Sequence, residues 1–152
     1  MRITAKADYA VRALVVLAAQ DPDQPTSADA IADSQGIPVA FLLKILGDLR
    51  TAGLVKSRRG ATGGYALATP ARQVTIADVI RAVEGPLADV RGQPPEHLEY
   101  PAPTTALRDV WLATRVALRD VLERTTIGDI ATDNLPAHVT AALDSPGADR
   151  RR

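Results

Sequence analysis

The sequence predicts a mainly α fold with a small β-hairpin, in which a winged helix-turn-helix domain is followed by one long helix. Three observations support this prediction. Two helical segments are joined by a short turn containing Gly36, and a strand, a Gly-rich turn and a returning strand follow at residues 54–68. A stripe of apolar residues at heptad spacing then covers residues 104–124. A hairpin directly after the second helix of a helix-turn-helix pair is a wing.

Composition restricts both the class of protein and its chemistry. A chain of 152 residues with 46% hydrophobic and 24% charged residues is expected to form one globular unit around one core. It has no Cys, and its only imidazoles are His97 and His138. We therefore expect no disulfide, no metal site, no cofactor and no enzyme, since no nucleophile and base can be paired. The apolar run 11–19 leads into Asp21 without a cleavage site, so we expect neither a secretion signal nor a membrane span. We therefore expect a cytoplasmic location.

The first three helices follow from apolar spacing and from capping residues. Residues 4–20 form the first helix after a Thr4 cap, and a second helix begins at Thr26 or Ser27 and stops at Gly36. A third begins at Pro38 and ends at Gly53. Its predicted buried stripe consists of Phe41, Leu42, Ile45, Leu46, Leu49 and Ala52.

The remaining segments divide the chain into four parts. A fourth helix at 75–84, with a capping box of Thr75 and Asp78, completes a domain of residues 1–85. Residues 86–103 hold five of the eleven prolines, which predicts an irregular loop of a length that is usually functional or disordered. Residues 104–134 form the long helix and a short one at 127–134, and residues 135–152 form a flexible tail that is weakly helical at best.

Local charge points to a polyanionic partner. The net charge of the chain is zero, but residues 44–72 contain six basic residues and one acidic residue, a local net charge of +5. A solvated basic face is the alternative interpretation. The wing favours double-stranded DNA, because Arg58 and Arg59 lie beside a Gly-rich turn that can approach a groove closely. Thr62, within this turn, is also expected to contact DNA. Lys56 and Arg50 can neutralise phosphates.

The exposed face of the third helix has few polar groups. It would present Val39, Ala40, Leu43, Lys44, Gly47, Asp48 and Thr51. We expect only modest base readout from this face, through thymine methyl groups and one acceptor edge. The Gly-rich turn could instead hold a nucleotide phosphate, but it joins two strands, and the sequence has no GxxxxGK[ST] motif.

The long helix predicts a homodimer. Two copies can bury a seam that one copy would leave in water, and that seam is formed by Leu107, Trp111, Leu118 and Val121. Trp111 is best explained as a core or interface anchor. His97, Glu96 and Glu99 could hold a metal ion, but an exposed polar loop explains them more simply.

Seven segments together resemble a known family. They are residues 2–4 and 9–14, "IADSQGIP" at 31–38, "LRTAGLVKSRRGATGGYAL" at 49–67, "TIADVIRAVEGP" at 75–86, and "VW" and "TIGDIA" at 110–111 and 126–131. In these segments the chain resembles the IscR/NsrR/RirA/CymR (Rrf2) family of bacterial winged-helix repressors, over roughly residues 1–134. The resemblance implies a homodimer that binds a pseudo-palindromic operator.

The resemblance also implies roles for particular residues. Arg59 of the wing would make minor-groove or base contacts, and six further residues would lie near the duplex: Arg2, Thr4, Lys6, Ala40, Phe41 and Lys44. Many members hold an iron-sulfur cluster with three Cys in the loop before the dimerisation helix, and some add residues of the first helix. Here that loop has no Cys, and the first helix offers Asp8 and Arg12. We expect a repressor without a cluster, in which an unknown small molecule or protein acts near the loop, with Asp8, Arg12 and His97 as the candidate effector region.

Two rival functions remain open from the sequence. The chain could be a winged-helix interaction module or co-regulator with weak DNA affinity. It could also be a small-molecule sensor with a pocket between the first helix and the dimerisation helix.

Overall fold

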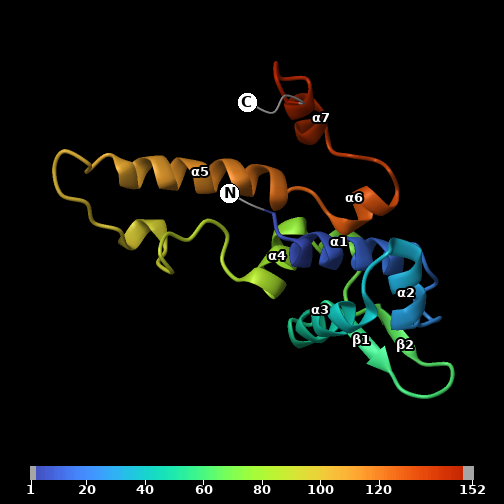
Figure 1. Ribbon diagram of the computed structural model, residues 1–152. Coiled ribbons are helices and arrows are strands. Elements are labelled where there is room, and N and C mark those ends of the chain that lie inside the picture. The colour runs from blue at the N-terminus through green and yellow to red at the C-terminus, as the bar shows by residue number, and fades with distance from the viewer. Residues whose placement is uncertain (1–2, 149–152) are drawn as a thin grey trace.

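The computed structural model describes residues 3–148, which form a head and an arm (Figure 1). The head comprises α1 (Ala5–Ala18), α2 (Ala28–Gln35), α3 (Val39–Thr51), β1 (Val55–Arg58), β2 (Gly64–Leu67), the 3-10 turn η1 (Ala71–Gln73) and α4 (Ile76–Glu84). The arm comprises residues 86–106, with the 3-10 turn η2 (Pro95–His97), and α5 (Leu107–Leu122). The chain then returns to the head through α6 (Ile127–Ala131) and continues into α7 (Ala137–Leu143).

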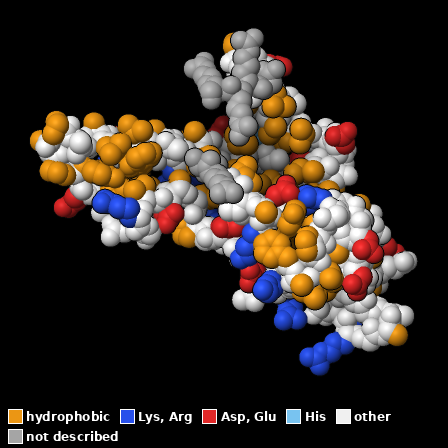
Figure 2. Space-filling model, viewed as in Figure 1, with side chains coloured by type: hydrophobic (Ala, Val, Ile, Leu, Met, Phe, Trp, Pro, Cys, Tyr) orange, Lys and Arg blue, Asp and Glu red, His pale blue; other side chains and the backbone are white. Residues whose placement is uncertain are grey.

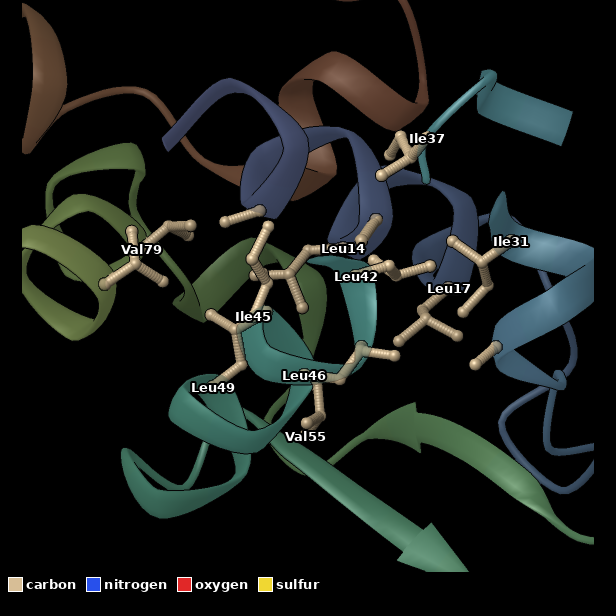
Figure 3. Packing of buried hydrophobic residues seen from close by; sticks show 14 of the residues in the cluster. Leu14, Leu17, Ile31, Ile37, Leu42, Ile45, Leu46, Leu49, Val55 and Val79 are labelled. Carbon is tan, nitrogen blue, oxygen red and sulfur yellow. The ribbon is translucent and has the colours of Figure 1, made fainter. Parts of the chain in front are cut away.

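Helix α1 lies at the centre of the head and contacts α2, α3, α4, α6 and β2. Ala10 and Ala13 are fully buried, and their small side chains allow these neighbours to approach closely. Leu14 packs beside Ile45 and Leu42 of α3 (Figure 3). The Thr4 hydroxyl accepts a hydrogen bond from Ala7 N and caps the helix, as predicted.

The helix-turn-helix pair is confirmed, with small corrections at the start and end of α3. Ser27 caps α2, Gly36 ends it with a φ of 62°, and the axes of α2 and α3 differ by 118°. Pro38 is the residue before α3, not its first helical residue. Ala52 is exposed, so its place in the predicted stripe is wrong, because the stripe leaves the core where the helix ends. Phe41 is half-buried, and the other four predicted positions are buried.

The wing is a two-stranded antiparallel hairpin, as predicted. Val55 pairs with Leu67, and Arg58 pairs with Gly64. A short bridge fixes the hairpin to the start of α2: Thr26 N donates to Tyr65 O at 2.9 Å, and Tyr65 N donates to Thr26 O at 2.8 Å. The orientation of the wing is therefore tied to the helix-turn-helix pair.

Helices α4 and α6 each begin with a capping box, and a bridge between the segments before them joins α6 to the head. Thr75 with Asp78 begins α4, and Thr126 with Asp129 begins α6. Hydrogen bonds from the Thr126 hydroxyl and backbone N–H lower the pKa of Asp129. The segments before the two helices form an antiparallel bridge, in which Ile127 N donates to Val74 O at 2.9 Å. Ile127 is fully buried, so α6 belongs to the core of the head.

The arm is more regular than the sequence predicts. Within the loop, Val90 and Gln93 form a bridge, η2 follows, and Pro95 and Leu98 are buried. Trp111 Nε1 of α5 donates to the Tyr100 hydroxyl at 3.1 Å, which holds the loop against the helix. Helix α5 begins at Leu107, three residues later than predicted, because the Thr104 hydroxyl and N–H both bond back to Pro101 O.

The segment after Leu135 also differs from its prediction. Ala137–Leu143 form α7, where at best weak helical structure was expected. A hydrogen bond of 3.2 Å joins His138 Nε2 to the hydroxyl of Thr125, which is 6% exposed. Within residues 3–148, no single helix is long and apolar enough to cross a membrane. Helices α2 and α3 are long and apolar enough only when taken together, and this pair is sharply bent.

Candidate nucleic-acid interface

The outer face of α3 is exposed and poor in polar groups, as predicted. Val39 is 38% exposed and Leu43 is 47% exposed, and Ala40 and Lys44 are exposed beside them. The Thr51 hydroxyl donates to Gly47 O within the helix, at 3.0 Å. To a groove of DNA, this face would present one cation and several small apolar surfaces.

Phe41 lies at the edge of this face. Its ring packs edge to face against Tyr9 of α1, with centroids 5.9 Å apart and planes at 79°. Its main structural contribution is to hold the start of α3 against α1.

The wing presents three exposed cations close together in sequence. Val55 points into the core, whereas Lys56, Ser57 and Arg58 of β1 are exposed, and so is Arg59 in the turn. Arg50 Nη1 lies 3.4 Å from Ser57 Oγ and links the end of α3 to the wing. Lys and Arg side chains gather along the lower edge of the head (Figure 2). Within residues 3–148, five cations of α3 and the wing form no ion pair: Lys44, Arg50, Lys56, Arg58 and Arg59.

The Gly-rich turn brings backbone very close to backbone. A Cβ atom on Gly63 would lie 2.3 Å from Arg58 O, and Gly63 N donates to Gly60 O at 2.9 Å. Only glycine fits at such a distance. Thr62 and Ala61 are exposed at the tip of the turn.

Two residues that the resemblance places near the duplex have partners inside the head. The Thr4 hydroxyl also donates to Glu84 Oε1 of α4. Lys6 Nζ lies 2.8 Å from Asp48 Oδ2 and donates to Val83 O at 2.6 Å. The Lys6 contact neutralises the one carboxylate of the basic segment. Arg2 lies outside the described residues.

Part of the predicted positive charge lies elsewhere. Arg72 packs against α6, where a Cβ atom on Gly128 would lie 2.7 Å from its Cγ, and its charge helps to lower the pKa of Asp129. Arg72 therefore does not belong with the wing cations.

The candidate effector residues have different neighbours. Arg12 Nη1 pairs with Asp8 Oδ2 at 3.3 Å, and its Nε donates to Gln35 Oε1 at 3.2 Å, so both residues serve the contact of α1 with α2. His97 belongs to η2, beside α5. No contact in the described residues brings these three side chains into one site.

An iron-sulfur cluster does not fit this chain. Thiolates are the usual ligands of such clusters, and the sequence has no Cys. Within residues 3–148, no group of three or more His, Asp or Glu side chains could hold a metal ion. The donor set lacks the chemistry that a cluster needs.

Three arginines around a hollow were not predicted from the sequence. The hollow, of about 580 Å³, lies between α4, the loop and α5, and is lined by Arg81, Arg115 and Arg119. The spacing of Arg115 and Arg119 puts both on one face of α5, which was the available signal. Arg81 comes from a different segment, so only the tertiary structure reveals the group.

Helix α5 keeps much of its apolar surface in contact with solvent. No residue of α5 is buried by the rest of residues 3–148. Of the predicted seam, Leu107, Trp111 and Leu118 are partly buried and Val121 is 38% exposed. Orange side chains cover much of the arm in Figure 2.

Known proteins resemble the chain over almost its whole length. The family model of Rrf2, described as an iron-dependent transcriptional regulator, matches residues 3–133. An HTH-type protein of Mycobacterium tuberculosis is 51% identical over 144 residues, covering 95% of this chain and 89% of that protein. The transcriptional regulator CymR of Bacillus subtilis is 38% identical over 132 residues, covering 87% and 91%.

Solved structures agree with these matches. The structure of B. subtilis CymR, titled the global cysteine regulator, has a TM-score of 0.74 at 36% identity and covers 88% of this chain and 98% of that one. The structure of IscR from T. potens has a TM-score of 0.71 at 30% identity and covers 99% and 97%.

Proposed function

Because the chain belongs to the Rrf2 family of DNA-binding transcriptional regulators, we propose that it acts as a homodimeric repressor of a pseudo-palindromic operator. Helix α3 of each copy enters a major groove, and each wing contacts the groove beside it. The observation that best supports this proposal is that five cations of α3 and the wing form no ion pair within residues 3–148. We place this activity in the cytoplasm, where bacterial DNA lies.

The proposed division of labour follows from the chemistry of the two surfaces. The α3 face offers Ala40, Leu43 and Lys44, so it reads shape and thymine methyl groups more than hydrogen-bonding edges. Arg59, in the turn directly after β1, supplies the guanidinium for base or minor-groove recognition. Lys56 and Arg50 neutralise phosphates and position the head.

We expect Arg59→Ala to weaken operator binding by about 1 to 3 kcal/mol and to relax sequence preference, because a groove-inserted guanidinium is lost. Lys56→Ala is the matched control on the same hairpin. It should weaken all duplexes alike and lower the slope of log affinity against log salt by about one. Binding isotherms on operator and scrambled duplexes at two salt concentrations measure both effects.

Two outcomes would contradict this proposal. If Arg59→Ala keeps full affinity and preference, the wing does not read DNA. If the wild-type protein binds operator and scrambled duplexes equally weakly, the rival function of an interaction module is favoured.

The dimer is proposed to form through α5. Two copies would bury the seam of Leu107, Trp111, Leu118 and Val121 and so place two heads side by side, with half-sites about one helical turn apart. Leu118→Glu should weaken the dimer by about 2 kcal/mol or more, because a carboxylate would be buried without a partner in each copy. Val116→Glu is the matched control, since Val116 is 64% exposed on the opposite side of α5. Sedimentation of the three proteins measures the change, and equal dissociation constants would place the interface elsewhere.

Control of the repressor is proposed to act through the arm and without a cluster. The loop of the arm connects the head to α5, which carries the proposed seam. A small molecule or protein that shifts this loop therefore changes the spacing of the two heads. Deletion of part of residues 88–100 should change regulation and leave operator affinity intact.

A further inference from the structure

The hollow between head and arm has the size and lining of a ligand site. Its volume of about 580 Å³ is within the range of about 300 to 1,000 Å³ that small-molecule pockets have. Leu87 and Pro95 are buried residues that form part of its apolar wall. Arg81, Arg115 and Arg119 supply three guanidinium groups around it.

The three guanidinium groups are only partly satisfied within the chain. Arg115 Nη1 lies 2.5 Å from Glu96 Oε2, and the Arg115 side chain is 16% exposed. Arg81 and Arg119 share the single carboxylate of Glu123, the latter pair at 3.6 Å. Arg81 also approaches Asp78 at 3.5 Å. A guanidinium has five N–H donors, so donors remain for an incoming anion.

Glu96 occupies the position that a ligand carboxylate would take on Arg115. It sits on η2, and its side chain is 44% exposed. Its own backbone N–H and then Arg115 lower the pKa of Glu96, so it is ionised near neutral pH. The Glu96 side chain is 44% exposed and pairs with one guanidinium only, so an anion that also reaches Arg119 and Arg81 can displace it.

We propose that the hollow binds a small organic anion, whose carboxylate or phosphate group replaces Glu96 on Arg115 and reaches Arg119 and Arg81. Asp89 also lines the hollow and has no ion pair within residues 3–148, so it selects a ligand that carries a hydroxyl or amino donor as well. The regulatory meaning of the site rests on the proposed function above.

Binding at this place would couple the arm to the head. Arg81 belongs to α4, which packs on α1 and α3, whereas Arg115 and Arg119 belong to α5. An anion that contacts both helices fixes their relative position, and the displaced Glu96 frees η2 from α5. Because α3 rests on α4, the change reaches the surface proposed to meet DNA.

The test uses the full chain and Trp111, its only Trp, as reporter. Trp111 bonds to Tyr100 of the loop and lies one turn from Arg115 on α5, so its fluorescence responds when the loop moves. The probes are malate and glycerol 3-phosphate, a hydroxy-carboxylate and a hydroxy-phosphate, with glycerol as the neutral control at constant ionic strength. We expect a saturable change with at least one anion and none with glycerol. Which anion binds more tightly identifies the head group, and no saturable change with either anion overturns the proposal.

Three variants distinguish a specific site from general attraction of anions. Arg115→Gln should weaken the binding of the responding probe by about tenfold, whereas Arg124→Gln should leave it unchanged, because Arg124 is 57% exposed and lies outside the hollow. Glu96→Gln should strengthen probe binding severalfold, because it removes the competing carboxylate. It breaks the same ion pair as Arg115→Gln, so it also controls for loss of stability. Equal affinities in all four proteins would overturn the proposal.

Duplex binding without probe keeps the two proposals separate. Arg124→Gln, which leaves the hollow intact, should bind the operator as the wild type does. If the wild type binds the probe but no duplex, the proposed function fails and the anion site stands; if it binds the duplex but neither anion, the anion site alone fails.

Discussion

Gly64→Ala is expected to detach the wing from α2 and to destabilise the protein by about 2 to 4 kcal/mol, with a parallel loss of operator affinity. Gly64 has a φ of +152°, and a Cβ atom there would lie 2.5 Å from Thr26 O. The contact is with backbone, so it cannot be relieved by a side-chain rotation. To make room, the hairpin must move away and break the two hydrogen bonds between Thr26 and Tyr65.

Gly60→Ala is the matched control for this prediction. Gly60 also has a positive φ, of +109°, but a Cβ atom at this position would have nothing within 4 Å of it. It should lose only the free energy of the unfavourable backbone conformation, about 1 to 2 kcal/mol. Urea unfolding and duplex binding of both variants measure the difference. Equal losses in the two would mean that the bridge to Thr26 does not orient the wing.

Ile45→Ala is expected to lower the free energy of unfolding by about 2 to 5 kcal/mol, a large fraction of the stability of a domain of this size. Ile45 is fully buried in α3, near Leu14 of α1 (Figure 3). Removing three carbon atoms leaves a cavity among tightly packed helices, and these cannot collapse without moving α3.

Leu43→Ala on the same helix should cost about 0.5 kcal/mol or less, because Leu43 is 47% exposed. Its effect should be on duplex binding, since it faces the proposed groove. Thermal and urea unfolding, followed by duplex binding at a temperature where both variants are folded, separates the two roles. If Leu43→Ala proves as destabilising as Ile45→Ala, α3 is rotated about its axis relative to the arrangement described.

Local patterns in the sequence predicted most of the head. The helices, hairpin and capping boxes follow from local residues, such as Thr75 with Asp78 at the start of α4, or Gly36 at the end of α2. The 3.6-residue spacing of Leu42, Ile45, Leu46 and Leu49 also fixed which face of α3 is buried. The errors fell where that stripe ends, at Ala52, and in weak patterns, at α7 and the loop.

The sequence by itself thus determined that this is a winged-helix protein with basic residues gathered in its third helix and wing and with no Cys to bind a cluster. Only the tertiary structure decided which cations remain available. Lys6 is paired with Asp48 of α3, and Arg72 lies beside Gly128 of α6, because the chain brings together residues that are far apart in sequence. The same reason explains the hollow: Arg81 meets Arg115 and Arg119 only when the loop folds back on α5, and no local period records that contact.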